Sequence, residues 1–221
     1  MIRALIFDFD GLILDTEVPK FQAWQEIYQD HGCYLPFELW AKCLGTYESV
    51  FDPFDYLENQ LRRSVDRNTI LTKRQQRCAE LLVAKPVLPG IQDYISDANR
   101  LGLRLGLASS SPRRWVVDNL LRLNLATHFT CIKCFEDVPC TKPDPALYQA
   151  VLDAFDLPAG QVIALEDSPN GVLAAKRAGL FCVAVPNSLT CRLPLDHADL
   201  QLASLADIPL ETLLAKMQNN R

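Results

Sequence analysis

Short apolar runs alternate with amphipathic stretches along much of this sequence. The first apolar run, residues 2–9, is rich in Ile, Leu and Phe and is typical of a strand buried inside a parallel sheet. The pattern predicts further strands at 104–108, 162–165 and 181–185. Strands that alternate with helices of this length are typical of right-handed βαβ units. The pattern therefore predicts an α/β protein with a doubly wound parallel sheet.

Capping and turn residues place helices between these strands. Ser111 before Pro112 and Asp144 before Pro145 each combine a side chain that can cap a helix with a proline suited to the first turn. We expect the hydroxyl of Ser111 to cap the helix that follows it. A later helix over 170–178 is expected to end at Gly179.

The region from 16 to 84 has a different pattern, with apolar residues at helical spacing and few β-branched runs. Residues 85–90, KPVLPG, contain two prolines and one glycine, as a linker would. We expect 16–84 to form an all-helical cap domain, inserted into a core made of 1–15 and 85–221. Such a cap would lie over the carboxyl ends of the strands, where open α/β sheets bind ligands.

Composition and charge exclude several classes of protein. The chain has 221 residues, of which 49% are apolar, and 22 basic against 27 acidic side chains give a net charge of −5. We expect no nucleic-acid partner, because dense basic patches are absent. We expect no membrane partner, because no apolar run approaches the roughly 18 residues of a spanning helix. Asp8 and Asp10 interrupt the apolar N-terminus, so we expect no secretory signal and a cytoplasmic location. The sequence carries no signal for an oligomeric state.

The eight cysteines allow two interpretations. Cys131 and Cys134 form a lone CxxC, with Cys140 nearby. A structural zinc site needs four ligands, and no second CxxC or paired histidine supplies the others. Reduced thiols, most of them buried, are therefore favoured over a zinc site.

Asp8 and Asp10 follow the first predicted strand. Residues i and i+2 of a strand face the same way, so both carboxylates would enter one crevice. Their mutual repulsion would be relieved by a divalent cation or by one proton shared between them. The ordinary alternative is a turn with two solvated acids.

Other polar groups are expected at the same edge of the sheet. Ser109 to Ser111 follow the strand at 104–108, and Glu166 and Asp167 follow the strand at 162–165. Lys142 precedes a predicted helix. Each alone is consistent with a helix cap, a solvated lysine or a turn. Their joint placement at one edge is harder to explain in that way and predicts a site.

This set of groups suits phosphoryl transfer. A phosphomonoester is a dianion and repels a carboxylate nucleophile, so Mg²⁺ and a lysine are needed to screen the charge. Mg²⁺ prefers oxygen ligands, and hydroxyl and backbone N–H groups can hold the remaining phosphate oxygens. One carboxylate would form an acyl phosphate, and the other would transfer protons.

Four motifs resemble those of the haloacid dehalogenase superfamily, in the branch with a small helical cap that includes β-phosphoglucomutase-like phosphatases. They span nearly the whole chain in the expected order. The matching segments are Asp8-Phe9-Asp10-Gly11-Leu12-Ile13-Leu14-Asp15-Thr16-Glu17, Ser109, Lys142-Pro143-Asp144-Pro145 and Glu166-Asp167-Ser168-Pro169-Asn170-Gly171.

The resemblance implies a Rossmann-like core and a role for each motif. Asp8 would be the nucleophile and Asp10 the general acid and base. Mg²⁺ would be held by the Asp8 carboxylate, the Asp10 backbone carbonyl and Asp167, with Glu166 nearby. The phosphoryl group would be bound by residues of the two middle motifs: Ser109, Ser110 and Lys142. In the cap, the residues expected to meet substrate are Thr16, Lys20, Gly45 and Thr46.

The implied activity is hydrolysis of small phosphomonoesters, such as sugar phosphates, through a phosphoaspartyl intermediate. Asp10 and Asp167 argue against a dehalogenase proper, which has no second aspartate there and needs no metal. A β-phosphoglucomutase remains the alternative, although it usually has a histidine in place of Lys20 and an arginine in the loop that here reads Gly-Thr-Tyr-Glu at 45–48. A catalytically inactive binding protein is disfavoured, because Asp8, Asp10 and Lys142 are all present.

Overall fold

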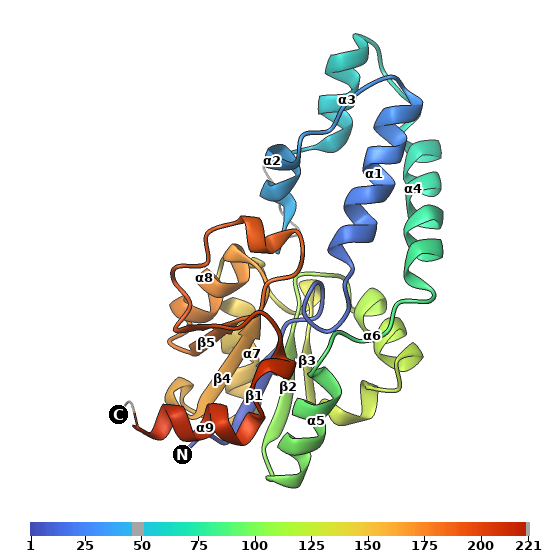
Figure 1. Cartoon of the computed structure of the whole chain (residues 1–221). Helices are drawn as coiled ribbons and strands as arrows, with labels where there is room; N and C mark the ends of the chain where they lie inside the picture. The colour runs from blue at the N-terminus through green and yellow to red at the C-terminus, as the bar shows by residue number, and fades with distance from the viewer. Residues whose placement is uncertain (46–50, 220–221) are drawn as a thin grey trace.

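Six strands form one parallel sheet in the computed structural model, which describes residues 1–45 and 51–219. The strand order is β3-β2-β1-β4-β5-β6, so the first strand lies near the centre (Figure 1). The strands are β1 (Ala4–Phe7), β2 (Arg104–Ala108), β3 (Cys131–Lys133), β4 (Val162–Glu166), β5 (Phe181–Ala184) and β6 (Leu200–Gln201). Strand β1 pairs in parallel with β2 and β4, with Ala4 opposite Arg104 on one side and Val162 on the other. The predicted α/β fold with a doubly wound parallel sheet is confirmed.

Helices cover both faces of the sheet. Successive side chains of β1 point to opposite faces, so they pack into two different apolar clusters, one on each face. Leu5 and Phe7 pack into the cluster that contains the buried residues of α5, α6 and α9. Ala4 and Ile6 pack into the cluster that contains those of α7 and α8. The bounds of these helices are α5 (Ile91–Arg100), α6 (Arg113–Arg122), α7 (Ala146–Phe155), α8 (Pro169–Arg177) and α9 (Leu210–Asn219).

Four further helices lie beyond the carboxyl ends of the strands (Figure 1). We call them the helical segment: α1 (Glu17–Asp30), α2 (Phe37–Trp40), α3 (Pro53–Leu61) and α4 (Arg67–Leu82). They bury an apolar cluster of their own, which includes Trp24, Tyr28, Trp40, Leu57 and Ile70. A core separate from the two clusters of the sheet is what an independently packed unit requires. The predicted division into two domains stays a prediction.

Two connections join the helical segment to the sheet, and they lie side by side. The backbone N–H of Leu88 donates to the carbonyl of Ile13 at 2.9 Å. The Nζ of Lys85 lies 2.5 Å from the Oδ2 of Asp15. The segment that was expected to act as a linker, 85–90, therefore runs back along the chain that leaves β1.

Several elements differ from the sequence-based expectation. Strand β1 ends at Phe7, so Asp8 and Phe9 already belong to the loop. Strands β3 and β6 were not predicted, because three half-buried residues and two residues, respectively, leave no apolar run to detect. Helices α5 and α9 were also not predicted individually. Where the structure describes the chain, every helix is too short or too polar to be a candidate for spanning a bilayer.

Candidate active site

Lys142 joins the ends of three adjacent strands. Its Nζ donates to the Oδ1 of Asp8 at 2.5 Å, to the Oε1 of Glu166 at 2.6 Å and to the carbonyl of Ala108 at 2.7 Å. Asp8, Lys142 and Glu166 are all buried. Since Asp8 follows β1, Ala108 ends β2 and Glu166 ends β4, one ammonium group fixes the carboxyl edge of the central sheet. The structure thus brings together three of the predicted residues.

Negative charge exceeds positive charge around this ammonium group. Burial raises the pKa of Asp8 to about 8, and Glu166 and Asp10 add to that effect while Lys142 opposes it. Burial also raises the pKa of Asp167 well above its usual value, with the charges of Asp8 and Glu166 acting in the same direction. Burial alone would lower the pKa of Lys142, but the charges of Asp8 and Glu166 raise it, so the lysine stays protonated. A further cation would relieve the remaining repulsion.

Three carboxylates are placed to hold such a cation. Within the described residues, Asp8, Glu166 and Asp167 each offer an oxygen within 4.8 Å of the others. The amide of Asn187 orients Asp167 by donating to its Oδ2 at 2.7 Å. Gly11 adopts a φ of +89°, and a Cβ there would lie 2.3 Å from the same oxygen. A buried set made only of carboxylate oxygens fits a hard divalent cation such as Mg²⁺.

Glu166 is fixed by the start of α8 and by α7. The hydroxyl of Tyr148, on α7, donates to its Oε1 at 2.5 Å. The backbone N–H of Asp167 donates to its Oε2 at 3.1 Å. Gly171 lies so close that a Cβ there would stand 2.0 Å from the Glu166 carboxyl. The first turn of α8 therefore sets the position of this carboxylate.

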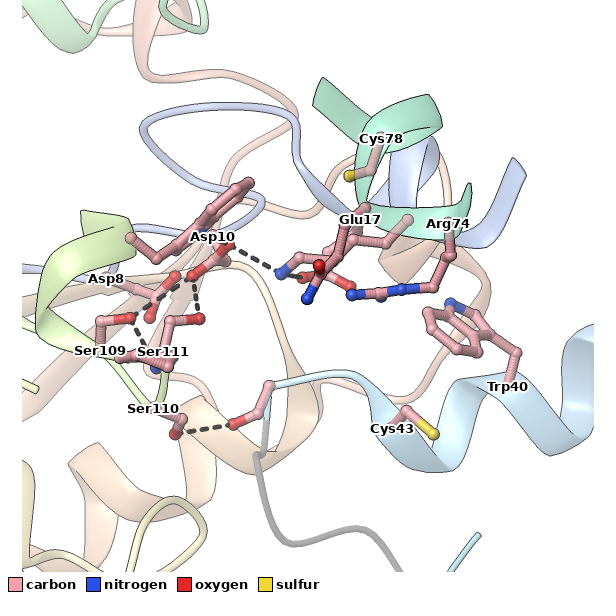
Figure 2. A pocket seen from close by; sticks show the side chains of 15 residues that line it. Asp8, Asp10, Glu17, Trp40, Cys43, Arg74, Cys78, Ser109, Ser110 and Ser111 are labelled. Atoms are coloured by element: carbon pink, nitrogen blue, oxygen red, sulfur yellow. Dashed lines mark hydrogen bonds and ion pairs between the residues drawn. The ribbon is translucent and has the colours of Figure 1, made fainter. Parts of the chain in front are cut away.

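The carboxylate of Asp10 is surrounded by donors, some of which are drawn in Figure 2. Burial alone would raise its pKa, but the charge of Lys20 and the hydrogen bonds from Lys20, Ser111 and Thr16 lower it to about 2. Asp10 is therefore ionised in this arrangement. Its donors are Lys20 Nζ at 2.8 Å, Thr16 Oγ1 at 2.8 Å, Trp115 Nε1 at 3.0 Å, Ser111 Oγ at 2.6 Å and Ser109 Oγ at 3.4 Å.

The predicted cap at Ser111 is wrong. The N-cap of α6 is Pro112, which has no side-chain capping bond. The hydroxyl of Ser111 donates to Asp10 instead, while its backbone N–H donates to the Oγ of Ser109 at 3.1 Å. Proline at the N-cap leaves the serine free to turn toward the carboxylate.

Ser110 joins the sheet to the helical segment. Its hydroxyl donates to the carbonyl of Gly45 at 3.3 Å (Figure 2). Asn170, at the start of α8, makes a similar contact by donating to the carbonyl of Leu44 at 2.8 Å. The two loops thus hold the chain that follows α2 against the edge of the sheet.

A cavity of about 580 Å³ lies between these loops and the helical segment. Asp8, Asp10 and the three serines line one side of it, and Lys20 and Gly45 line it from the helical segment. Thr16 is buried beneath Asp10 and is not among the lining residues. Thr46 lies outside the described residues. A volume of this size suits a small metabolite.

Four polar residues of the site were given no role from the sequence. The Oε1 of Glu17 accepts from Lys20 at 2.9 Å, and the other three contact Asp10, Glu166 and Asp167 as described above: Trp115, Tyr148 and Asn187. Glu17 stands at the end of the first motif, which offered a signal. The other three lie within a helix or a late loop, where nothing in the local pattern distinguishes them from packing or turn residues.

Comparison with known proteins finds relatives along nearly the whole chain. The sequence profile described as haloacid dehalogenase-like hydrolase matches residues 5–185. The chain is 42% identical, over 97% of both sequences, to YhcW of Bacillus subtilis (strain 168), whose name provisionally describes it as a phosphatase. It is 29% identical to the "phosphorylated carbohydrates phosphatase" of Thermotoga maritima over 81% of this chain and 82% of that protein. It is 28% identical to the β-phosphoglucomutase of Bacillus subtilis (strain 168), over 100% of this chain and 97% of that protein.

Solved structures share the fold. The crystal structure of a mutant of CbbY from Rhodobacter sphaeroides in complex with xylulose-(1,5)bisphosphate has a TM-score of 0.72 and 28% identity, and the match covers 94% of this chain and 96% of that one. The β-phosphoglucomutase of Clostridium difficile has a TM-score of 0.76 at 21% identity, over 100% of this chain and 99% of that one. At that identity, the second likeness concerns the fold alone.

Proposed function

Since the chain belongs to the haloacid dehalogenase-like hydrolase family, we propose that it is a Mg²⁺-dependent phosphatase that hydrolyses small phosphomonoesters. The observation that carries the proposal is the buried contact between Asp8 and Lys142 at 2.5 Å, beside two further carboxylates at the end of β4. The name of the Thermotoga maritima relative supports a phosphorylated carbohydrate as the substrate class.

In the proposed mechanism, Asp8 is the nucleophile. One of its carboxylate oxygens attacks phosphorus, so an Asp8–phosphorus bond forms while the bond from phosphorus to the leaving oxygen breaks. Water then attacks the phosphoaspartyl group, which releases inorganic phosphate and restores Asp8. Lys142, Ser109 and Ser110 bind the phosphoryl oxygens, and the ammonium charge of Lys142 offsets the charge that develops on them.

Asp10 transfers the protons. It protonates the leaving oxygen in the first step and accepts a proton from the attacking water in the second. The charge of Lys20 and the donated hydrogen bonds lower the pKa of Asp10 to about 2, so it is ionised in this arrangement but only weakly basic until it loses some of these donors. To act as an acid, Asp10 must first exchange some of its donors, such as Lys20 and Ser111, for contacts with the substrate.

Mg²⁺ would be held by the carboxylates of Asp8 and Asp167 and the backbone carbonyl of Asp10, with Glu166 beside it. When bound, it supplies a positive charge that offsets the repulsion between the carboxylate nucleophile and the phosphate dianion. Asn187 and Gly11 keep Asp167 turned toward the site.

We also propose that 16–84 acts as a cap domain on a core of 1–15 and 85–221. In this arrangement Lys20, Gly45, Thr16 and Thr46 serve the substrate or Asp10 from the cap side. A cytoplasmic location is supported by the eight cysteines, none of which forms a disulfide bond among the described residues.

A sugar-phosphate mutase is the second candidate, because the chain aligns with a β-phosphoglucomutase over its whole length. A mutase must grip a distal phosphate. Lys20, which could have done so, already contacts Asp10 and Glu17 at 2.8 and 2.9 Å. Lys20 is therefore not available for that role, and the phosphate-release assay described below decides between the two functions.

Asp8→Asn tests the proposal directly. The substitution keeps the size of the side chain but removes the attacking charge, so release of inorganic phosphate from p-nitrophenyl phosphate should fall by several orders of magnitude. Asp97→Asn, an aspartate of α5 paired with Arg100, is the matched control and should keep normal turnover.

Turnover by a verified Asp8→Asn preparation that matches the Asp97→Asn control would contradict the phosphoaspartyl mechanism. The same assay separates the two candidate functions with sugar phosphates as substrates. A phosphatase releases phosphate steadily, whereas a mutase isomerises the sugar phosphate and releases little.

A further inference from the structure

The wall of the cavity opposite Asp8 is formed by the helical segment. Arg74 of α4 and Trp40 of α2 both line it, together with Glu17 of α1 (Figure 2). Arg74 and Trp40 lie next to each other, on the far side of the cavity from the serines. None of the steps proposed above uses either of them.

Two buried N–H groups on this wall have no hydrogen-bond partner among the described residues. They are the Nε of Arg74 and the Nε1 of Trp40. Trp40 as a whole is only 5% exposed. A buried donor without a partner destabilises the protein by about 1–3 kcal/mol, and more when it is charged. Two of them on one wall therefore indicate a place for an acceptor that arrives from outside.

The charges on this wall favour an acidic acceptor over a neutral hydroxyl. Arg74 has no carboxylate partner among the described residues, and its guanidinium lies 5.9 Å from the centre of the Trp24 ring. Burial lowers its pKa from the ordinary value, which indicates that its charge is poorly solvated. The Lys20 ammonium, by contrast, is already paired with Asp10 and Glu17. The charge of Glu17 on the same wall acts on Arg74, but no described carboxylate contacts it. A partly buried cation without a contacting anion gains from an anionic ligand.

We propose that Arg74 and Trp40 form a second anion subsite, so that the preferred substrates are phosphomonoesters with another acid group, a carboxylate or a phosphate, at their far end. The inference rests on the proposed phosphatase activity, which places the ester phosphate at Asp8. The guanidinium of Arg74 would pair with the distal acid, and the indole N–H of Trp40 would donate to the same group.

Two pairs of esters isolate the distal group. 6-Phosphogluconate and sorbitol 6-phosphate differ only by a carboxylate in place of a hydroxymethyl group. Fructose 1,6-bisphosphate and fructose 6-phosphate differ by the second phosphate. For each pair, the ratio of kcat/KM values for phosphate release should favour the acid-bearing ester by about ten-fold or more, as expected for a charged hydrogen bond. The pair with the larger ratio identifies the acid.

Arg74→Gln should reduce this ratio to near one, and Arg74→Lys should restore part of it. Trp40→Phe keeps an aromatic ring but removes the donor, so it should reduce the ratio several-fold. Arg77→Gln is the matched control, because Arg77 lies on the same helix but pairs with Glu26 at 2.8 Å and Glu80 at 3.2 Å. It should leave the ratio unchanged. Arg74→Gln should lower the melting temperature little, because no described carboxylate pairs with this charge and the contact with the Trp24 ring is a weak one.

Binding of the same four esters to Asp8→Asn, measured by calorimetry, gives a second readout that does not depend on turnover. The inference is overturned if the acid-bearing esters have no advantage in either readout, or if Arg74→Gln keeps the advantage of the wild type. If no ester, including p-nitrophenyl phosphate, releases phosphate, the proposed activity fails. The calorimetric ratios then still test the subsite.

Discussion

Asp10 receives donors from both the helical segment and the loops of the sheet, which makes its role testable. If it protonates the leaving oxygen, Asp10→Asn should slow formation of the phosphoenzyme by about 10²–10⁴-fold for a sugar phosphate. An aryl phosphate with an acidic phenol needs little protonation, so the loss should be much smaller. Rapid-quench measurement of the burst rate with both esters gives the comparison.

Thr72→Ala is a control for Asp10→Asn, because the side chain of this exposed threonine of α4 hydrogen-bonds, among the described residues, only within its own helix, to the carbonyl of Asn68. It should leave both burst rates intact. Equal slowing of both esters by Asp10→Asn would mean that Asp10 is not the general acid and acts on the metal or the structure instead.

Residues that follow strands were predictable, whereas their supporting residues were not. Asp8, Glu166 and Asp167 come directly after apolar runs, so their convergence with Lys142 followed from the parallel sheet. Ser111 was misassigned because a serine before a proline has the sequence of a cap. Arg74 lies among polar residues of α4, and only packing shows that its guanidinium faces the cavity rather than solvent.

The first turn of α8 sets the position of Glu166, so a small substitution in that turn should change the rate of phosphate release. In Gly171→Ala the added Cβ would stand 2.0 Å from the Glu166 carboxyl. We expect a loss of about 1–3 kcal/mol in stability from overpacking. We also expect phosphate release to fall at least ten-fold, with a higher requirement for Mg²⁺, because a displaced Glu166 moves Lys142. Thermal unfolding and a Mg²⁺ titration of the activity measure both effects.

Ala178→Gly is the companion variant, since Ala178 closes the same helix away from the site. It should alter stability without changing the Mg²⁺ requirement. If Gly171→Ala titrates with Mg²⁺ as the wild type does, the packing of α8 does not control the carboxylate.

The helices and strands that could be predicted from the sequence are those with the most buried residues. The strands buried on both faces stand out as apolar runs, and β2 has the predicted bounds. Strand β3 is half-buried along its length, and β6 pairs only at the edge of the sheet, so neither leaves a pattern of period two. The position of the helical segment over the strand ends was predictable from topology, because an insertion after β1 must start at that edge.

For the molecule as a whole, the closely spaced carboxylates of Asp8 and Asp167 should make the free energy of unfolding depend on pH and on Mg²⁺. The pKa of Asp8 is raised to about 8, so the folded protein holds a proton that the unfolded chain releases near pH 4. This stabilisation is present below pH 4 and is lost as the pH rises toward 8. The slope for one such group is at most about 1.4 kcal/mol per pH unit, and Asp167 acts in the same direction.

In EDTA, the melting temperature of the wild type should therefore fall between pH 5 and pH 8 more steeply than that of Asp8→Asn. Mg²⁺ replaces the proton, so it should raise the wild-type melting temperature more at pH 8 than at pH 5 and restore activity lost in EDTA. Differential scanning calorimetry of both proteins with EDTA or Mg²⁺ supplies the measurement. The prediction is contradicted if the melting temperatures of the two proteins fall equally steeply with pH, or if Mg²⁺ raises the wild-type melting temperature by the same amount at pH 5 and pH 8.

The pairing of β1 has a consequence for synthesis on the ribosome. Its neighbours in the sheet begin at Arg104 and Val162, so its central place cannot be filled until most of the chain has been made. Helices α1 and α4, in contrast, lie within one continuous stretch and can pack while the rest is still being translated. The apolar β1 must wait unpaired until β2 has been made and keeps one edge unpaired until β4 has been made, and the loop closures it needs are slow ones. The nascent chain is therefore most exposed to aggregation before β4 emerges, and a chaperone that shields residues 4–7 would act in that window.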